Sequence, residues 1–246
     1  MTVIDNARSV IASAIAEFGS TLAVLTSFQR EGVVIIDLVM QVAPHIPVIT
    51  IDTGRLPTAT HDMIAAVEQR YGIAVERIVP DGREVEAMVS SYGPDLFYDG
   101  VASRSLCCNV RKVRPLAHRL AGVAAYFTGI RRGQSETRAE INVVDRSGAT
   151  VKISPLADWS ADDVIRYTRE FGLPESALYA AGYTSIGCDP CTRAVQPGED
   201  ERAGRWWWEN DADKECGLHF SPDGRVERTV DVLLREVLSR AEGLKI

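Results

Sequence analysis

The five cysteines of this chain are the residues whose spacing most clearly indicates chemistry. Cys107 and Cys108 are adjacent, Cys188 and Cys191 form a C-x-x-C, and Cys216 stands alone. An odd number of cysteines argues for metal binding or reactivity rather than for a set of disulfides. The C-x-x-C spacing lets two thiolates converge on one metal centre, and a second pair would complete four ligands. The sequence therefore predicts a metal site formed by the two pairs and leaves Cys216 as a candidate nucleophile.

Zinc and an iron–sulfur cluster compete for four converging thiolates, because soft thiolate ligands suit both. A vicinal pair is strained as a chelate on one tetrahedral ion, whereas it can more easily reach two different irons of a cubane. Arg111 and Lys112 follow the vicinal pair by one helical turn and would offset the negative charge of a thiolate-ligated cluster. These features favour a [4Fe–4S] cluster over zinc. Two buried cysteine pairs that never meet are the alternative.

Positive charges surround Cys216 in the sequence. Lys214 precedes it and His219 follows it by three residues, and Arg202 and Arg205 lie upstream. Nearby cations lower the pKa of a thiol and so favour the thiolate, which is the nucleophilic form. An inert cysteine is the alternative. The spacing leaves three roles open for His219, which are general acid, stabiliser of the thiolate and plain surface histidine.

Arginines also occur where they could bind an anion. Arg131 and Arg132 follow an apolar run directly, and Arg202 and Arg205 precede three consecutive tryptophans. The planar, permanently charged guanidinium suits phosphate and sulfate oxygens. Solvated salt bridges are the alternative, because Glu and Asp are interspersed, but a place at a strand end favours the functional interpretation.

Strands and helices are expected to alternate around these residues. Apolar runs predict strands at residues 21–28, 47–52, 74–79 and 124–130. Periodic patterns predict helices at residues 32–43, 58–71, 83–92, 110–120 and 228–241, and another that starts near Ser160 with a capping box to Asp163. The alternation predicts an α/β fold, a mostly parallel twisted sheet with helices on both faces.

We interpret residues 1–246 as a single α/β domain. Residues 182–220 would be an irregular segment within it, holding the cluster loop and a mobile C-terminal part that carries the nucleophilic cysteine. Ligands of such sheets bind beyond the carboxyl ends of the strands, which directs attention to the loops at residues 27–32, 53–57 and 129–138. Ser27 before a helix start could cradle an anion with backbone N–H groups. Neither G-x-x-x-x-G-K-[ST] nor G-x-G-x-x-G occurs.

The bulk composition excludes some partners. A net charge of −7 and a pI near 5.2 argue against wrapping nucleic acid or coating an anionic membrane. The first residues lack a basic start followed by a long apolar run, and no apolar run is long enough to span a bilayer. We therefore expect a cytoplasmic protein, in a compartment where thiols stay reduced.

Five segments together carry a family resemblance. They are IDTGRL at residues 51–56, SRSLCC at 103–108, TGIRRGQS at 128–135, SIGCDPCTR at 185–193 and KECGLH at 214–219. With them the chain resembles the bacterial assimilatory adenylyl-sulfate (APS) reductases of the PP-loop-related adenine nucleotide α-hydrolase-like superfamily. The first loop differs, because many relatives have a Ser-x-Gly-x-Glu-Asp type sequence where this chain has Ser27–Gly32, SFQREG.

The resemblance implies thioredoxin-dependent reduction of adenosine 5′-phosphosulfate to sulfite and AMP in sulfate assimilation, a step toward cysteine. Cys216 would attack the sulfate sulfur, expel AMP and form an S-sulfocysteine, from which thioredoxin or glutaredoxin releases sulfite. The resemblance assigns the [4Fe–4S] ligands to Cys107, Cys108, Cys188 and Cys191. It gives substrate contact to Lys112, Arg131, Arg202 and Arg205, a place near the nucleophile to His219, and the nucleotide pocket to Ser27, Thr53, Gly54, Arg55 and Gly129.

Three alternatives are weighed against this interpretation. A 3′-phospho-APS reductase generally lacks the two cysteine pairs. An ATP-dependent sulfurtransferase or adenylyltransferase usually has a Ser-Gly-Gly-x-Asp loop, which is absent. A non-catalytic iron–sulfur redox sensor would not need Cys216 with its basic neighbours. The sequence is compatible with a homo-oligomer and does not decide it.

Overall fold

The computed structural model describes residues 2–209 and 225–243. The chain divides into two compact units. Unit 1 contains residues Met1–Thr50, Leu56–Arg77 and Leu120–Arg205, and unit 2 contains Ile51–Arg55, Ile78–Arg119 and Trp206–Ile246. The interpretation of residues 1–246 as one domain stays a prediction.

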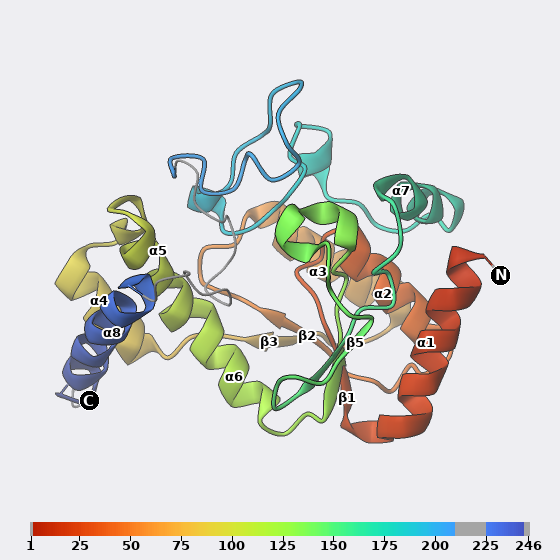
Figure 1. The fold of residues 1–246 in the computed structure, drawn as a ribbon, viewed down its shortest axis with the longest axis horizontal. Coiled ribbons are helices and arrows are strands. Elements are labelled where there is room, and N and C mark those ends of the chain that lie inside the picture. The colour runs from red at the N-terminus through yellow and green to blue at the C-terminus, as the bar shows by residue number, and fades with distance from the viewer. Residues whose placement is uncertain (1, 210–224, 244–246) are drawn as a thin grey trace. The chain divides into compact units, whose positions relative to one another are not determined.

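A six-stranded sheet forms the framework of unit 1, with β2 and β3 ending at its boundary with unit 2 (Figure 1). Its strands are β1 (Leu22–Leu25), β2 (Val48–Ile51), β3 (Glu76–Ile78), β4 (Ala125–Phe127), β5 (Val144–Asp145) and β6 (Val151–Ile153). Their order is β3-β2-β1-β4-β6-β5; β1 pairs in parallel with β2 and β4, β4 with β6, and β5 runs antiparallel. The predicted α/β class with a mostly parallel sheet is confirmed.

The strand order places a topological switch point at β1. The chain proceeds from β1 to β2 and β3 on one side and returns to β4 on the other. Ligands of open α/β sheets bind outside the carboxyl ends of the strands at such a point. The loops after β1 and β4 are therefore the ones that the topology brings together.

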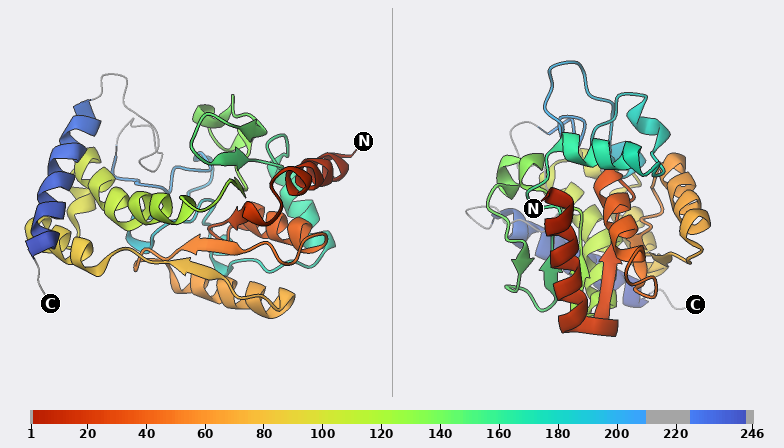
Figure 2. Two further views of the ribbon diagram at one scale, coloured as in Figure 1. Left: turned by 90° about the horizontal axis from the view of Figure 1, so that it is seen from below. Right: turned by 90° about the vertical axis from the view of Figure 1, so that its right-hand side faces the viewer.

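Four helices belong wholly to unit 1. They are α1 (Val3–Phe18), α2 (Arg30–Met40), α3 (Thr58–Tyr71) and α7 (Ala161–Glu170). Helix α2 contacts both α1 and α7 (Figure 2). Its residues Val33, Val34, Ile35 and Ile36 are buried together with strand residues such as Val24 and Phe127 in the hydrophobic core. This apolar burial provides the main driving force that fixes α2 on the sheet.

Buried polar groups fix α2 further. The carboxylate of Asp37 accepts hydrogen bonds from the hydroxyls of Tyr71 on α3 and Tyr167 on α7, each at 2.7 Å, and from Gln41 at 2.7 Å. A buried carboxylate is costly unless it is hydrogen-bonded, so this network holds three helices in one register.

Helices make up most of the described part of unit 2. They are α4 (Gly82–Tyr92), α5 (Val101–Cys108), a π-helical turn (Asn109–Val113), α6 (Arg114–Leu120, whose last residue is already in unit 1) and α8 (Arg225–Gly243). Helix α8 contacts α4 and α5. Val237 of α8 is fully buried. In the residues that the structure describes, no helix is long and apolar enough to cross a membrane.

Candidate active site

The turn after β1 has an unusual backbone. Phe28 is buried, and its φ of 57° lies in the left-handed region that non-glycine residues rarely adopt. The hydroxyl of Thr26 accepts a hydrogen bond from the Phe28 backbone at 2.9 Å, and Gly32 passes so close to Thr26 that a side chain there would collide with its hydroxyl. Ser27 itself is exposed. Such local strain is characteristic of ligand-binding turns.

The loops after β1 and β4 meet, as the switch point predicts. A Cβ atom on Gly129 would lie 2.7 Å from the Cβ of Glu31 and 3.0 Å from the backbone nitrogen of Gly32. Only a residue without a side chain lets the two backbones approach this closely. Ser27 and Gly129, both predicted to line the nucleotide pocket, therefore belong to two adjacent loops.

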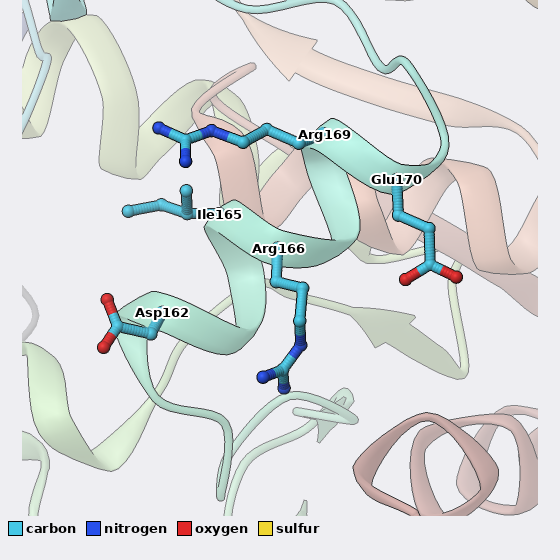
Figure 3. A pocket seen from close by; sticks show the side chains of 5 residues that line it. All are labelled: Asp162, Ile165, Arg166, Arg169 and Glu170. Carbon is cyan, nitrogen blue, oxygen red and sulfur yellow. The ribbon is translucent and has the colours of Figure 1, made fainter.

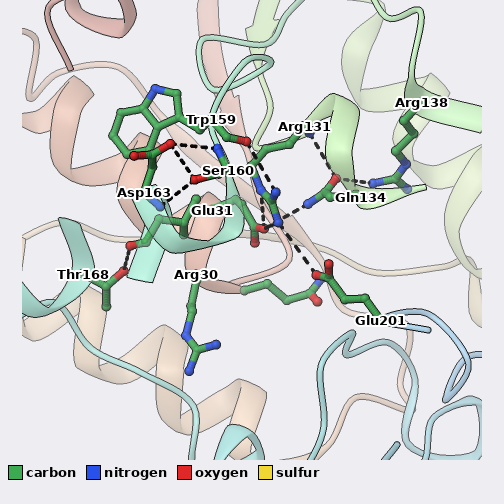
Figure 4. A network of polar contacts seen from close by, with 12 residues as sticks. Arg30, Glu31, Arg131, Gln134, Arg138, Trp159, Ser160, Asp163, Thr168 and Glu201 are labelled. Carbon is green, nitrogen blue, oxygen red and sulfur yellow. Dashed lines mark hydrogen bonds and ion pairs between the residues drawn. The ribbon is translucent and has the colours of Figure 1, made fainter. Parts of the chain in front are cut away.

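Arg131 is buried rather than presented to solvent, with 2% of its side chain exposed. Its guanidinium donates from Nε to the Glu31 carboxylate at 2.8 Å and lies 2.7 Å from it through Nη2, as Figure 4 shows. The carboxylate of Glu201 lies 3.8 Å from the same nitrogen, Nη2. Burial raises the pKa of the Glu201 carboxyl, and the charge of Arg131 opposes that rise. Arg131 thus joins the two loops of the switch point to the segment before Arg202.

The loop that carries Cys188 and Cys191, residues 187–192, is closed by Thr192 and is called the cysteine loop below. Its hydroxyl accepts a hydrogen bond from the Gly187 backbone at 3.0 Å and donates to the Cys188 carbonyl at 2.9 Å. A short 3-10 turn, Asp189–Cys191, lies between these contacts, with Pro190 in its first turn. Cys188 and Cys191 are both buried. The loop also contacts the turn after β1, because the Ile186 backbone donates to the side chain of Gln29 at 2.8 Å.

Arg205 is packed on this cysteine loop. Its backbone forms a β-bridge with Thr192, and the Arg193 backbone donates to the Gly204 carbonyl at 3.0 Å. A Cβ atom on Gly187 would lie 2.5 Å from the guanidinium carbon of Arg205, so the glycine makes room for the guanidinium. Arg205 is buried, and Arg202 is half-buried and accepts a backbone hydrogen bond from Arg205 at 2.9 Å.

In unit 2, Arg111 organises the loop after β2. Its guanidinium donates to the Thr53 carbonyl at 2.8 Å and lies beside Gly54, whose φ is 69°. Within the loop, Gly54 donates to the Asp52 carboxylate and Arg55 to the Thr53 hydroxyl. The side chain of Arg55 forms an ion pair with Asp95 at 3.3 Å. Thr53, Gly54 and Arg55, which were predicted to line the nucleotide pocket, are thus held in one rigid turn.

The vicinal cysteines Cys107 and Cys108 end helix α5 and are both buried. The π-helical turn after them carries Arg111 and the half-buried Lys112. Arg111 is buried, and its Nε has no hydrogen-bond partner among the described residues. A buried cation one helical turn after two cysteines in the sequence fits a negatively charged group such as a thiolate-ligated cluster.

The structure thus groups the predicted residues into two sets. Unit 1 brings together Ser27, Gly129, Arg131, Cys188, Cys191, Arg202 and Arg205. Unit 2 holds Thr53, Gly54, Arg55, Cys107, Cys108 and Lys112. Cys216 and His219 lie outside the described residues. No group of three or more His, Cys, Asp or Glu side chains able to hold a metal ion occurs in the described ranges, so convergence of the two cysteine pairs stays a prediction.

A shallow hollow of about 580 Å³ lies apart from these residues on the outer side of α7 (Figure 3). Its lining is made of side chains from one helix, which are Asp162, Ile165, Arg166, Arg169 and Glu170. None of the predicted site residues contributes to it, so it carries no functional interpretation.

Sequence reasoning missed three residues that shape the site. Glu31 neutralises Arg131, Thr192 closes the cysteine loop, and Phe28 strains the turn after β1. Thr192 had a local signal, because it directly follows the C-x-x-C and a hydroxyl there can bond back to the loop. The pairing of Glu31 with Arg131 spans 100 residues and left no such signal.

Comparison with known proteins assigns the family. Residues 21–194 match the model of the phosphoadenosine phosphosulfate reductase domain. Adenosine 5′-phosphosulfate reductase of Allochromatium vinosum is 48% identical over 202 residues, which cover 80% of this chain and 79% of that protein. The protein of the same name from Agrobacterium fabrum is 44% identical over 211 residues, which cover 85% and 81%.

A solved structure agrees with these sequences. The crystal structure of phosphoadenylyl-sulfate (PAPS) reductase from Candida auris, a phosphate complex, superposes with a TM-score of 0.65 and 28% identity, covering 77% of this chain and 90% of that one. The resemblance inferred from the sequence motifs is confirmed. This chain is a member of the phosphoadenosine phosphosulfate reductase domain family.

Proposed function

We propose that this protein is an oxidoreductase that reduces adenosine 5′-phosphosulfate (APS) to sulfite and AMP in sulfate assimilation. The observation that carries the proposal is the placement of Arg205. Its buried guanidinium lies on the cysteine loop at Gly187, directly upstream of the segment that contains Cys216. The curated relatives at 48% and 44% identity are named for this activity.

The first chemical step is nucleophilic. The thiolate of Cys216 attacks the sulfur of the sulfonyl group, an S–S bond forms, and the S–O bond to the AMP phosphate breaks. AMP leaves with the electron pair of that bond, and Cys216 becomes S-sulfocysteine. Because the leaving group is a phosphate, its departure needs no strong acid. His219 lies three residues from the nucleophile and is assigned to stabilise the thiolate.

Fixed cations make this step feasible, because a thiolate that approaches a sulfate ester is an anion approaching an anion. We assign this positive charge to Arg202, Arg205 and Lys112. Arg205 is held by its β-bridge and by Gly187, so it costs little reorganisation when charge develops. Arg131 is already paired with Glu31. We therefore assign it to hold the loops after β1 and β4 in place rather than to neutralise the substrate.

The nucleotide binds at the loops that follow the strands. We assign contact with the nucleotide to Ser27 and Gly129, in the loops after β1 and β4, and to Thr53, Gly54 and Arg55, in the turn after β2. Exposed backbone N–H groups and small side chains in such loops suit a ribose and an α-phosphate.

The same proposal assigns a [4Fe–4S] cluster to Cys107, Cys108, Cys188 and Cys191. When bound, the cluster supplies a thiolate-ligated iron centre with net negative charge. Arg111 would offset that charge from the π-helical turn. Thr192 would keep the thiols of Cys188 and Cys191 in the orientation that a shared centre requires.

A dithiol protein completes the cycle. One thiolate of thioredoxin, or of a glutaredoxin, attacks the Cys216 sulfur and releases sulfite, and its second thiol then resolves the mixed disulfide. The thioredoxin or glutaredoxin leaves as its disulfide, and Cys216 returns to the thiol. Thioredoxin is a reductant of the cytoplasm, where we place this enzyme.

Sulfite release from APS and from its 3′-phosphorylated form, each with thioredoxin and its reductase, tests the proposal. We expect sulfite from APS and a covalent adduct of SO₃ on the peptide of Cys216 when thioredoxin is omitted. The Cys216→Ser variant should keep its iron and its colour and release no sulfite. Preference for the 3′-phosphorylated nucleotide, or a wild-type peptide without adduct, would overturn the assignment.

A further inference from the structure

A buried ion pair of unit 2 lies outside the site described so far. Arg104 donates from Nε to the Oε1 of Glu209 at 2.8 Å and from Nη2 to Oε2 at 3.2 Å. Both side chains are 3% exposed. The guanidinium also lies over the ring of Trp206, 4.4 Å from its centroid. The pair is therefore bidentate, desolvated and stacked on an aromatic face, which fixes its geometry in two directions.

The two partners come from segments that matter to the proposed chemistry. Arg104 is on α5, one helical turn before Cys107 and Cys108. Glu209 is the last residue described before the segment that contains Cys216. The ion pair thus ties the start of that segment to the helix that ends in the vicinal cysteines.

A second contact fixes the same segment. The ring of Trp208 packs edge-on against Tyr98 with centroids 4.5 Å apart, and against Phe97 at 6.0 Å. Both partners belong to the 3-10 turn Leu96–Tyr98, which contacts α5. Residues 206–209 are therefore held by an ion pair at one end and by an aromatic cluster in the middle.

The attachment of residues 206–209 fixes the point from which the chain continues to Cys216. Cys216 lies seven residues after Glu209, so a fully extended chain would reach about 25 Å from it. We propose that Arg104 and Glu209 are positioning residues: they fix residues 206–209 to helix α5, and this attachment raises the frequency with which the thiolate of Cys216, seven residues further along the chain, meets the substrate. This inference rests on the proposed function, because it takes Cys216 as the nucleophile.

Stability alone does not explain the pair. Replacing a buried ion pair by apolar side chains of similar volume is often neutral or stabilising, because desolvation offsets the Coulombic gain. What a bidentate arginine adds is one defined register between two segments. Proximity effects on rate are large, and a displacement near 1 Å at a distant position can cost about 100-fold.

The test separates positioning from folding. The Glu209→Gln variant keeps the shape of the side chain and loses its charge. The Arg104→Leu/Glu209→Leu double variant replaces the ion pair by apolar side chains and keeps the site packed. A matched control is Glu84→Gln, which breaks the bidentate pair of Glu84 with Arg114 between α4 and α6 in the same unit. Each protein is mixed with saturating APS, and formation of the S-sulfocysteine on Cys216 is followed in a single turnover by mass spectrometry.

We expect Glu209→Gln and the double variant to form the adduct about 10- to 100-fold more slowly than the wild type. Their affinity for AMP, measured by calorimetry, and their visible cluster absorbance should match those of the wild type, and Glu84→Gln should form the adduct at the wild-type rate. If Glu209→Gln does not fold, the double variant decides.

Two results would overturn the inference. They are a wild-type rate in Glu209→Gln or in the double variant, and a loss of rate in Glu84→Gln as large as in Glu209→Gln. A wild-type protein that forms no adduct would contradict the proposed function itself, and the inference with it, so the two failures are distinguishable.

Discussion

The hydroxyl of Thr192 accepts a hydrogen bond from the backbone nitrogen of Gly187 over 3.0 Å and so closes the loop that holds Cys188 and Cys191. The same hydroxyl donates to the Cys188 carbonyl at 2.9 Å. Valine has nearly the same shape as threonine and can make neither bond. We expect Thr192→Val to hold the proposed cluster about 10- to 100-fold less tightly, which is the usual cost of losing an outer-shell partner. Iron content after timed exposure to a chelator measures this.

The matched control for that experiment is Thr192→Ser, which keeps the hydroxyl. It should retain iron as the wild type does. Equal iron loss in Thr192→Ser and Thr192→Val would mean that the methyl group matters rather than the hydrogen bonds, and the interpretation of the loop would be wrong.

Gly129 allows the loops after β1 and β4 to approach each other. A Cβ atom there would lie 2.7 Å from the Cβ of Glu31 and 2.9 Å from its backbone carbon, and backbone cannot move aside cheaply. We expect Gly129→Ala to lower the free energy of unfolding by about 1–3 kcal/mol and to weaken AMP binding. Urea unfolding and calorimetry with AMP measure both. Gly122→Ala is the control, because a Cβ atom on Gly122 meets nothing within 4 Å; equal effects in both variants would contradict the prediction.

Because Arg131 and Glu31 form a buried ion pair, we expect the effects of replacing them on the free energy of unfolding to be strongly coupled. Arg131 is 2% exposed, and with Glu31→Gln its nearest remaining carboxylate, that of Glu201, lies 3.8 Å away. An uncompensated buried charge is costly, so we expect Glu31→Gln to lower the free energy of unfolding by about 3–5 kcal/mol. The Glu31→Gln/Arg131→Gln double variant should recover part of this loss. Chemical denaturation of the wild type, Glu31→Gln, Arg131→Gln and the double variant gives the coupling energy, and strictly additive losses would show that the pair is not a unit.

Much of the fold could be predicted because its signals are local. The predicted helix at residues 58–71 has the bounds of α3, and the predicted capping box of Ser160 and Asp163 opens α7. Helix α1 was not predicted, although its own capping box of Thr2 and Asp5 was a readable signal. Strands β5 and β6 were also missed, since they are two and three residues long and take their order from pairing rather than from an apolar run.

The predicted helix at residues 110–120 is a different case. The structure has a π-helical turn at Asn109–Val113 that joins α5 to α6, so the helical region begins already at Val101. The predicted strand at residues 21–28 is shorter, because Thr26 and Phe28 form the strained turn instead. A periodic pattern contains neither the local hydrogen bond of Thr26 nor the change from α- to π-helical winding.

The sequence predicted which residue types form the candidate site, but not how their side chains are packed. Residue type alone identified the cysteine pairs and the arginines, because thiolates and guanidinium groups have few chemical uses. It could not tell that Arg131 is neutralised by Glu31 whereas Arg205 is packed on Gly187. These two arginines look alike in sequence, and only long-range packing distinguishes a positioning cation from one held beside the cysteine loop.

Alkaline pH should weaken the contact between α4 and α8. The hydroxyl of Tyr92 on α4 donates to Glu236 on α8 at 2.7 Å, and burial, followed by this hydrogen bond, raises the pKa of Tyr92 from 10.0 to about 12. The folded state holds the proton of the Tyr92 hydroxyl more tightly than the unfolded state does. The stabilisation that Tyr92 contributes is therefore fully present below pH 10.0 and is lost as the pH rises to about 12. The stability difference between the wild type and Tyr92→Phe in urea should therefore shrink across this window. The other tyrosines are common to both proteins and cancel, so a difference that stays constant with pH would mean that Tyr92 does not titrate with the folding of unit 2.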